Sequence, residues 1–214
     1  MTARGFSLVE LAVVLALLAA AFATVLPAAQ SRRARQETEA TLARTVEAIY
    51  AEHGFLADLG RLPVLPELTA RGALPPARWS SGLPVGWAGP YLEGATADGW
   101  ERALRLDPDG RVRSAGPNGI FDDEDDLIAP AYPPLPRGAA GSLCVEAPAG
   151  ALVQALVPDA SGAPAWVSAT PAGSCGHFFA ALPAGRRLVQ AGSASAAVVV
   201  SRGASAVARL GGSL

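Results

Sequence analysis

The chain has 214 residues, of which 50% are hydrophobic, and a formal net charge of −2. This length accommodates one large or two small domains in addition to a membrane segment. Nucleic-acid-binding domains usually carry a basic face, so the slightly acidic balance argues against nucleic acid as a partner.

The first predicted element is an apolar helix near the N-terminus. Residues 6–26 form an apolar run that is interrupted by one charge, Glu10. About twenty residues at roughly 1.5 Å each are enough to span the hydrocarbon core of a bilayer. A carboxylate inside a membrane segment is costly, so Glu10 is a candidate functional residue.

The helical pattern continues past the apolar run. Residues 30–53 contain neither Pro nor Gly, and Leu42, Val46 and Tyr50 recur on one helical face. Gly54 is a stop signal. We therefore expect one helix over about residues 6–53, apolar all round in its first half, with Pro27 kinking or loosening it at the junction.

The residues alone leave three interpretations of this segment open. It is a cleaved secretory signal, an ordinary single-span anchor, or an assembly helix. The apolar run is longer than a typical signal core, and helical patterning does not stop at the small residues near position 28.

The stretch GFSLVE at residues 5–10 resembles the prepilin cleavage motif of type IV pilins and type II secretion pseudopilins. The resemblance covers residues 5–53, including the position of Pro27. It implies cleavage after Gly5 by a prepilin peptidase, with residues 1–5 as the leader, and methylation of the new N-terminal residue, Phe6. It also implies that Glu10 of one subunit meets the charged amine of Phe6 on a neighbour. This pairing stabilises a helical polymer and sets the axial register of its subunits.

Residues 54–130 are predicted to form a small head. A short helix is expected near residues 66–71, between loops. Residues 102–106 and 111–114 flank the turn sequence Asp-Pro-Asp-Gly at 107–110, which predicts a hairpin. We expect a small antiparallel sheet that covers the apolar face of the long helix.

This head resembles the major pseudopilin of type II secretion at GPYL (89–92), Asp-Gly-Trp (98–100) and SAGPNGIFDDEDDL (114–127). In that family the last segment binds calcium. The resemblance assigns Asn118, Asp125 and Asp126 as ligands, with Asp122 as a further oxygen donor. Ca²⁺ takes six to eight oxygen ligands, which this loop is rich enough to supply. The chain departs from the family pattern by having Asn118 in place of Asp, and a solvated acidic loop is the alternative.

A Pro- and Gly-rich linker is expected over residues 131–141, followed by a β-sandwich over residues 142–214. About seven short apolar segments, separated by turn signals, predict this sandwich. Residues 176–192 resemble carboxypeptidase-regulatory-like (prealbumin-like) domains, which usually are structural or adhesive modules.

The sandwich contains both cysteines of the chain, Cys144 and Cys175. A disulfide between them is predicted if this part is exported. Cys175 and His177 lack an orienting third group for nucleophilic catalysis, and no catalytic motif is present. We therefore do not expect an enzyme.

The sequence thus predicts an α+β chain: a long N-terminal helix packed on a small antiparallel sheet, then a small all-β sandwich. The favoured hypothesis is a pilin-like structural subunit that sits in the inner membrane, with its globular domains outside the cytoplasm, before it enters a periplasmic pseudopilus or surface pilus. Its expected partners are other subunits, the prepilin peptidase and the inner-membrane assembly platform. The alternative is a membrane-tethered, exported binding module that does not polymerise.

Overall fold

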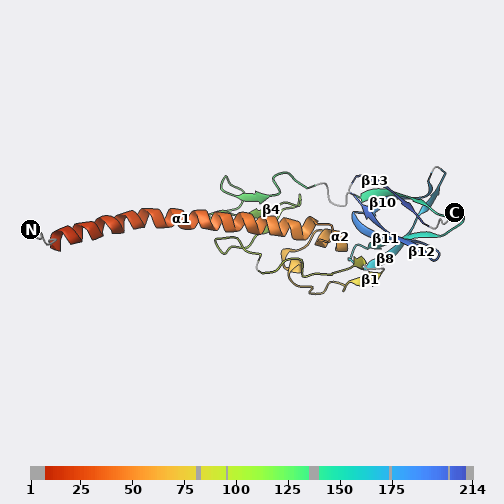
Figure 1. The fold of residues 1–214 in the computed structure, drawn as a ribbon, viewed down its shortest axis with the longest axis horizontal. Coiled ribbons are helices and arrows are strands. Elements are labelled where there is room, and N and C mark those ends of the chain that lie inside the picture. Colours follow the sequence, from red (N-terminus) through yellow and green to blue (C-terminus); the bar gives the residue numbers. More distant parts are fainter. Residues whose placement is uncertain are drawn as a thin grey trace, which may run out of the picture.

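A computed structural model describes residues 8–80, 83–94, 96–134, 140–173, 175–201 and 203–210, without the side chains of residues 22–25, 79 and 80. The fold is α+β, as expected. One long helix carries a small mixed head along its second half, and a β-sandwich follows at the far end (Figure 1).

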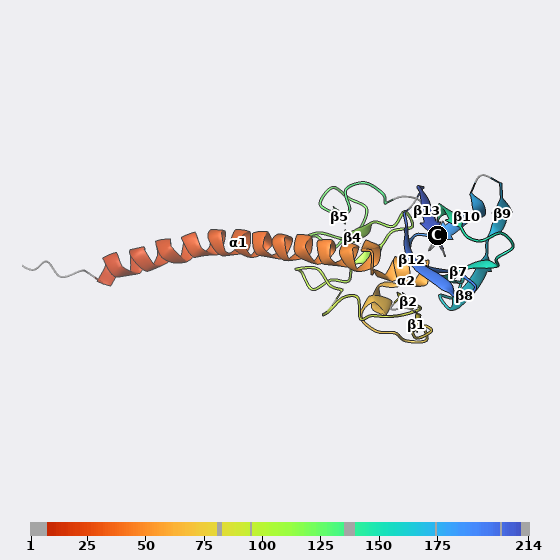
Figure 2. The same ribbon diagram turned by 45° about the vertical axis from the view of Figure 1, so that its right-hand side comes forward.

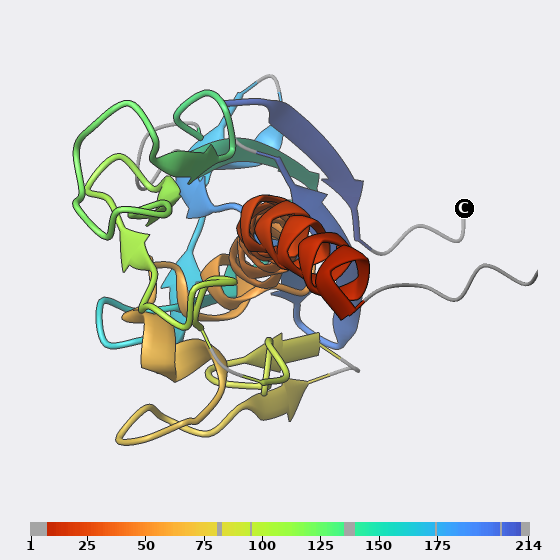
Figure 3. The ribbon, with the colours of Figure 1, turned by 90° about the vertical axis from the view of Figure 1, so that its left-hand side faces the viewer.

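The long helix α1 runs from Leu8 to Tyr50. Its first half extends away from the rest of the protein, whereas its second half is flanked by head segments (Figures 1 and 2). Viewed along the helix, the head segments lie to its left and below it (Figure 3). The buried face includes Ala34, Thr38, Thr41, Leu42, Thr45, Ala48 and Ile49. Three of these residues are threonines whose hydroxyls donate to the carbonyl four residues earlier. They therefore place no unsatisfied polar group in the core.

The head consists of short elements between loops. Phe55 and Leu59, in α2, are fully buried against α1. A two-stranded hairpin (β1–β2) and a three-stranded antiparallel sheet in the order β3-β4-β5 complete it. The elements are α2 (Phe55–Leu59), the 3₁₀ helix η1 (Leu65–Leu68), β1 (Arg78–Ser80), β2 (Leu83–Val85), β3 (Arg105–Leu106), β4 (Val112–Ser114) and β5 (Leu127–Ala129).

The C-terminal part is a sandwich of two four-stranded sheets, in the orders β13-β6-β10-β9 and β12-β11-β7-β8. Among the strand pairs that the structure describes in the sandwich, β13–β6 is parallel and the others are antiparallel. Alternate residues of the strands face a shared apolar core that includes Leu143, Val145, Val189 and Leu182. The strands are β6 (Ala140–Glu146), β7 (Val153–Pro158), β8 (Pro164–Ser168), β9 (Thr170–Ala172), β10 (Gly176–Pro183), β11 (Gly185–Ala191), β12 (Ala194–Val200) and β13 (Ser205–Arg209).

The head and the sandwich share a seam. Leu83 and Val85 of β2 pack with Leu156 of β7 and Leu188 of β11 in one buried cluster. The sandwich is therefore attached to the head by side-chain packing in addition to the linker.

Several details differ from the sequence expectations. The long helix ends at Tyr50 rather than near residue 53, and α2 was not expected. The short helix expected at residues 66–71 is the 3₁₀ turn Leu65–Leu68, because Pro66 at its start suits a tight turn. The sandwich begins at residue 140, inside the expected linker, and has eight strands since β8 continues into β9 of the other sheet.

Candidate functional site

The first half of α1 is an apolar surface that nothing in the described protein covers. Leu8 is 85% exposed, Leu11 53% and Leu17 66%. Within the part of the chain that the structure describes, this helix has the length and composition to cross a membrane, and its most apolar stretch is not buried in the protein. Glu10 lies in the first turn of α1 and is exposed, so it places a carboxylate on this apolar surface. Gly5 and Phe6 lie outside the described residues.

Pro27 lies inside α1, which continues through it as one helix. The helix curves gently rather than breaking (Figure 2). Because proline removes one backbone hydrogen bond, Pro27 marks the point at which α1 bends at least cost. This point separates the exposed apolar half from the half that is packed against the head.

The Asp-Gly-Trp step fastens the head to α1. The amide of Gly99 donates to Thr38 Oγ1 at 2.8 Å, and a side chain at Gly99 would overlap the Ala34 carbonyl. Asp98 holds the loop in place. Its carboxylate accepts from the amides of Trp100 and Arg102 and from the Ser114 hydroxyl on β4. This motif therefore has a structural role in docking.

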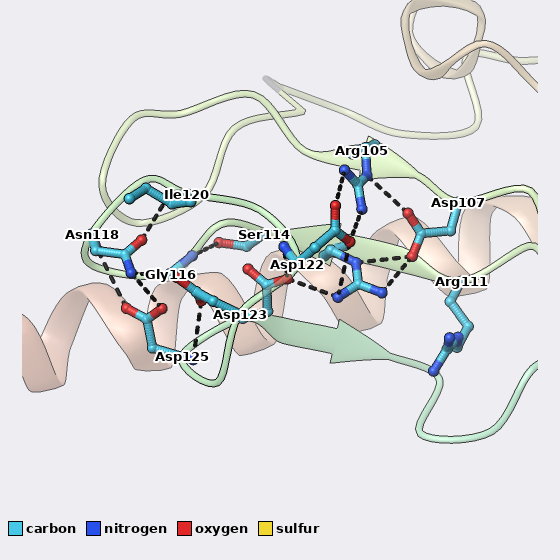
Figure 4. Close-up of polar contacts among 12 residues, drawn as sticks. Arg105, Asp107, Arg111, Ser114, Gly116, Asn118, Ile120, Asp122, Asp123 and Asp125 are labelled. Atoms are coloured by element: carbon cyan, nitrogen blue, oxygen red, sulfur yellow. Dashed lines mark hydrogen bonds and ion pairs between the residues drawn. The ribbon is translucent and has the colours of Figure 1, made fainter.

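The acidic loop between β4 and β5 contains one cluster around Asn118 (Figure 4). The Asn118 side-chain amide donates to Asp123 Oδ2 at 2.6 Å and to Asp125 Oδ1 at 2.9 Å. The side chains of Asp123 and Asp125 are hydrogen-bonded to each other. This bond raises the pKa of Asp125 and lowers the pKa of Asp123. Two carboxylates therefore lie close enough to share a proton, the arrangement that a bound cation would relieve.

A second cluster in the same loop is an ion-pair network (Figure 4). Arg105 contacts both oxygens of Asp122, at 3.1 and 2.6 Å, and this hydrogen bonding lowers the pKa of Asp122. Arg113 bonds Asp126 Oδ2 at 2.7 Å and Asp107 Oδ2 at 2.8 Å. The two arginines come from adjacent antiparallel strands and tie the loop to the sheet.

These contacts divide the four predicted calcium ligands. Asn118 and Asp125 lie together, with Asp123, which is not among the predicted ligands, as a neighbour. Asp122 and Asp126 are instead engaged by arginines. Asp126 Oδ1 is nevertheless buried and has no hydrogen-bond partner.

The described residues contain no group of three or more His, Cys, Asp or Glu side chains placed to hold a metal ion. The Asn118 cluster fits a hard cation by its donor types, which are two carboxylates and an amide. The Asn118 amide oxygen accepts from the Ile120 amide at 2.6 Å, so this side chain must turn over to present oxygen instead of nitrogen. Asp122 does not fit, because Arg105 occupies both of its oxygens.

The two cysteines are adjacent in space and are present as thiols. Cys144 Sγ lies 3.4 Å from the carbonyl oxygen of Cys175, and a side-chain hydrogen bond with Cys175 raises the pKa of Cys144 to about 11. Cys144 pairs with Phe178 in the β6–β10 ladder, which brings the segment just before β10 next to β6. The predicted disulfide therefore requires no large rearrangement and stays a prediction.

The seam between head and sandwich contains a buried arginine that sequence reasoning missed. Arg187 is 1% exposed and donates to the carbonyls of Ala57, Pro183 and Ala184 at 2.8, 2.9 and 2.5 Å. Burial lowers its pKa to about 10, and Asp58 opposes that shift. Because Ala57 belongs to the head and Arg187 to the sandwich, this side chain bridges the two.

Asp58 lies on the head side of this seam and is 4% exposed. Burial raises its pKa to about 6, against the opposing effects of the Tyr91 hydroxyl, Arg187 and His53. The Tyr91 hydroxyl donates to Asp58 Oδ2 at 2.8 Å. No sequence motif marks either Asp58 or Arg187, which are far apart in the chain.

A groove of about 1050 Å³ opens beside this seam. Its walls come from the end of α1, from α2 and the residues up to Pro66, from β3, and from the sandwich at residues 183–185 and 199–201. Apolar side chains such as Leu62, Leu106 and Val199 form much of the lining. The groove is a candidate binding surface.

Comparison of the chain with protein-family models, with curated proteins and with solved structures finds no match.

Proposed function

We propose that the protein is a pilin-like structural subunit, of a type II secretion pseudopilus or a type IV pilus, which assembles through α1. The observation that carries this proposal is the form of α1. Its exposed apolar half continues, without a break, into a half that forms the core of the head. An apolar surface of this extent requires a membrane or other apolar helices around it.

Glu10 gives the proposed assembly its register. In a bundle of such helices, the Glu10 carboxylate of one subunit meets the N-terminal amine of Phe6 on a neighbour. Each charge is costly in an apolar environment, and their pairing offsets that cost. Cleavage after Gly5 and methylation of Phe6 are parts of the same proposal, as is the location in the inner membrane with the globular domains outside the cytoplasm.

The test uses the full chain expressed with its own assembly machinery. We expect Glu10→Ala to leave membrane insertion and cleavage intact but to reduce fibres by at least tenfold, as measured by shearing and immunoblotting. Glu37→Ala is the matched control, since it removes an exposed helical carboxylate that pairs with Arg33 outside the apolar half. Normal fibre formation by the Glu10 variant, or a mature N-terminus at Gln30, would contradict the proposal.

Within this class, the head motifs favour the type II secretion pseudopilus. The same proposal includes a calcium site, with Asp123, Asp125 and the turned-over Asn118 amide as donors and the buried oxygen of Asp126 as a further candidate. A bound Ca²⁺ would neutralise the adjacent carboxylates and hold the acidic loop closed. The support for this site is the proximity of Asp123 to Asp125 and the orphaned Asp126 oxygen.

A second candidate function is a membrane-tethered binding module that does not polymerise. The observation that favours it is the groove between head and sandwich, because ligand sites often form between packed domains. The Glu10 experiment separates the two functions: a binding module does not depend on Glu10.

A further inference from the structure

Three arginines follow the exposed apolar half of α1 within one helical turn. Arg32, Arg33 and Arg35 are all exposed, and the side chains of Arg33 and Arg35 are 82% and 65% exposed. Between them, Ala34 is buried, because the loop at Gly99 packs against it. We refer to Arg32, Arg33 and Arg35 as the arginine collar.

The helix distributes the collar around its circumference. With about 100° between successive residues, Arg33 and Arg35 lie roughly 100° to either side of Ala34, and Arg32 lies about 160° from it. Ala34 faces the head, since it is buried against the loop at Gly99. The three guanidinium groups therefore cover the sides of α1 that the head leaves open.

The collar also lies at a defined height above the apolar half. Arg32 is about 9 Å and Arg35 about 14 Å along the helix axis from Leu26, where the apolar run ends. Side chains of an α-helix tilt toward its N-terminus, which here is the side of the apolar half. Arginine stems can extend along that direction and place their charge in the headgroup layer, which is several ångströms thick.

Two of the arginines have competing partners on the helix. Arg33 and Arg35 contact Glu37 and Glu39 at 2.8 and 3.1 Å. An exposed ion pair of this kind shifts the equilibrium for pair formation by about twofold. An arginine at an anionic membrane surface increases the affinity for that surface roughly fivefold. The membrane therefore outcompetes the glutamates.

We propose that the arginine collar binds the phosphate groups of anionic phospholipids. Guanidinium groups form paired hydrogen bonds with phosphate oxygens, and three of them around one helix present this geometry to lipids on its open sides. The collar thereby fixes the depth of α1 in the bilayer and holds the head directly above the headgroups. This inference depends on membrane insertion of α1, and not on polymerisation.

The test measures lipid selectivity of the full chain in phosphatidylcholine vesicles. These vesicles contain a trace of spin-labelled phosphatidylglycerol or spin-labelled phosphatidylcholine, and electron paramagnetic resonance gives the fraction of each label that the protein immobilises. We expect about a fivefold or greater preference for phosphatidylglycerol, which falls below twofold in the combined variant R32Q/R33Q/R35Q and in 0.5 M salt. The variant R32K/R33K/R35K should retain most of the preference, because it retains the charge.

The matched control replaces three exposed arginines outside the collar, as R71Q/R78Q/R209Q, and should leave the preference unchanged. Equal immobilisation of both lipids by the native protein, or an unchanged preference in R32Q/R33Q/R35Q, would overturn the proposal. If the protein immobilises neither lipid, both the membrane insertion of α1 and lipid binding by the arginine collar are refuted. Loss of fibres without loss of lipid preference would assign the collar to a contact between subunits instead.

Discussion

Replacement of Arg187 tests whether one side chain holds the sandwich to the head. In Arg187→Met, the carbonyls of Ala57, Pro183 and Ala184 lose a charged donor. Hydrogen bonds to a charged group are worth about 1.5–3 kcal/mol each, but the substitution also removes the cost of burying a charge. We expect a net loss of about 3–5 kcal/mol in the free energy of unfolding.

The loss of stability in Arg187→Met should depend on pH, because Asp58 changes its protonation state between acidic and neutral pH. The pKa of Asp58 is about 6 in the folded protein and 3.8 ordinarily, so the folded state binds more protons between these values and stability falls as pH rises through them. Arg187 lowers this pKa. Without Arg187 the pKa of Asp58 rises further, and each unit adds about 1.4 kcal/mol to the cost of ionising it. The destabilisation should therefore be larger at pH 8 than at pH 5.

The assay is urea unfolding of the full-length protein in detergent, followed by the fluorescence of its four tryptophans at both pH values. Arg186→Met is the control. Arg186 is adjacent in sequence but half-exposed and 3.7 Å from Glu52, so its replacement should cost less than 1 kcal/mol. A loss below 1 kcal/mol for Arg187→Met, or an equal loss at both pH values, would refute the bridging role.

Three further outcomes are expected. Gly99→Ala should lower the free energy of unfolding by about 2 kcal/mol, because the added methyl group overlaps the α1 backbone. The control Gly173→Ala, whose methyl group enters open space, should change it by less than 0.5 kcal/mol. Similar losses in the two variants would disprove the close approach of Gly99 to α1. Millimolar Ca²⁺ should raise Tm of the native protein by several degrees but not that of Asp125→Asn, and an unchanged native Tm would rule out the calcium site. Cys144→Ser should cost roughly 3–4 kcal/mol under oxidising conditions and less than 1 kcal/mol under reducing ones if the cysteines pair; equal costs would exclude the disulfide.

The elements with local signals were predictable from the sequence. The hairpin of β3 and β4 follows from the Asp-Pro-Asp-Gly turn at 107–110, which constrains the chain within four residues. The helix follows from the repeat of Leu42, Val46 and Tyr50 on one face. Leu42 is buried, and Val46 and Tyr50 are half-buried against the same core. The short apolar segments of the C-terminal part, with turn signals between them, likewise predicted the sandwich.

The seam and the acidic loop were not predictable in detail, because they depend on residues distant in sequence. Ala57 and Arg187 meet across 130 residues, and no periodicity encodes that contact. The composition of the acidic loop indicated oxygen donors, but not that Arg105 would occupy Asp122. That pairing depends on the register of β3 and β4, which places both arginines opposite each other on one edge of the loop.

The position of the sandwich bears on where such a subunit would act in a polymer. The sandwich lies beyond the C-terminal end of α1, roughly in line with the helix (Figures 1 and 2), and the Arg187 contacts and the β2 seam fix it there. In any lattice of helices packed along one axis, a domain beyond the helix end takes space that subunits further along would fill. A subunit at the growing end has no such neighbour. If the protein polymerises as proposed, this fold therefore favours a terminal position for it.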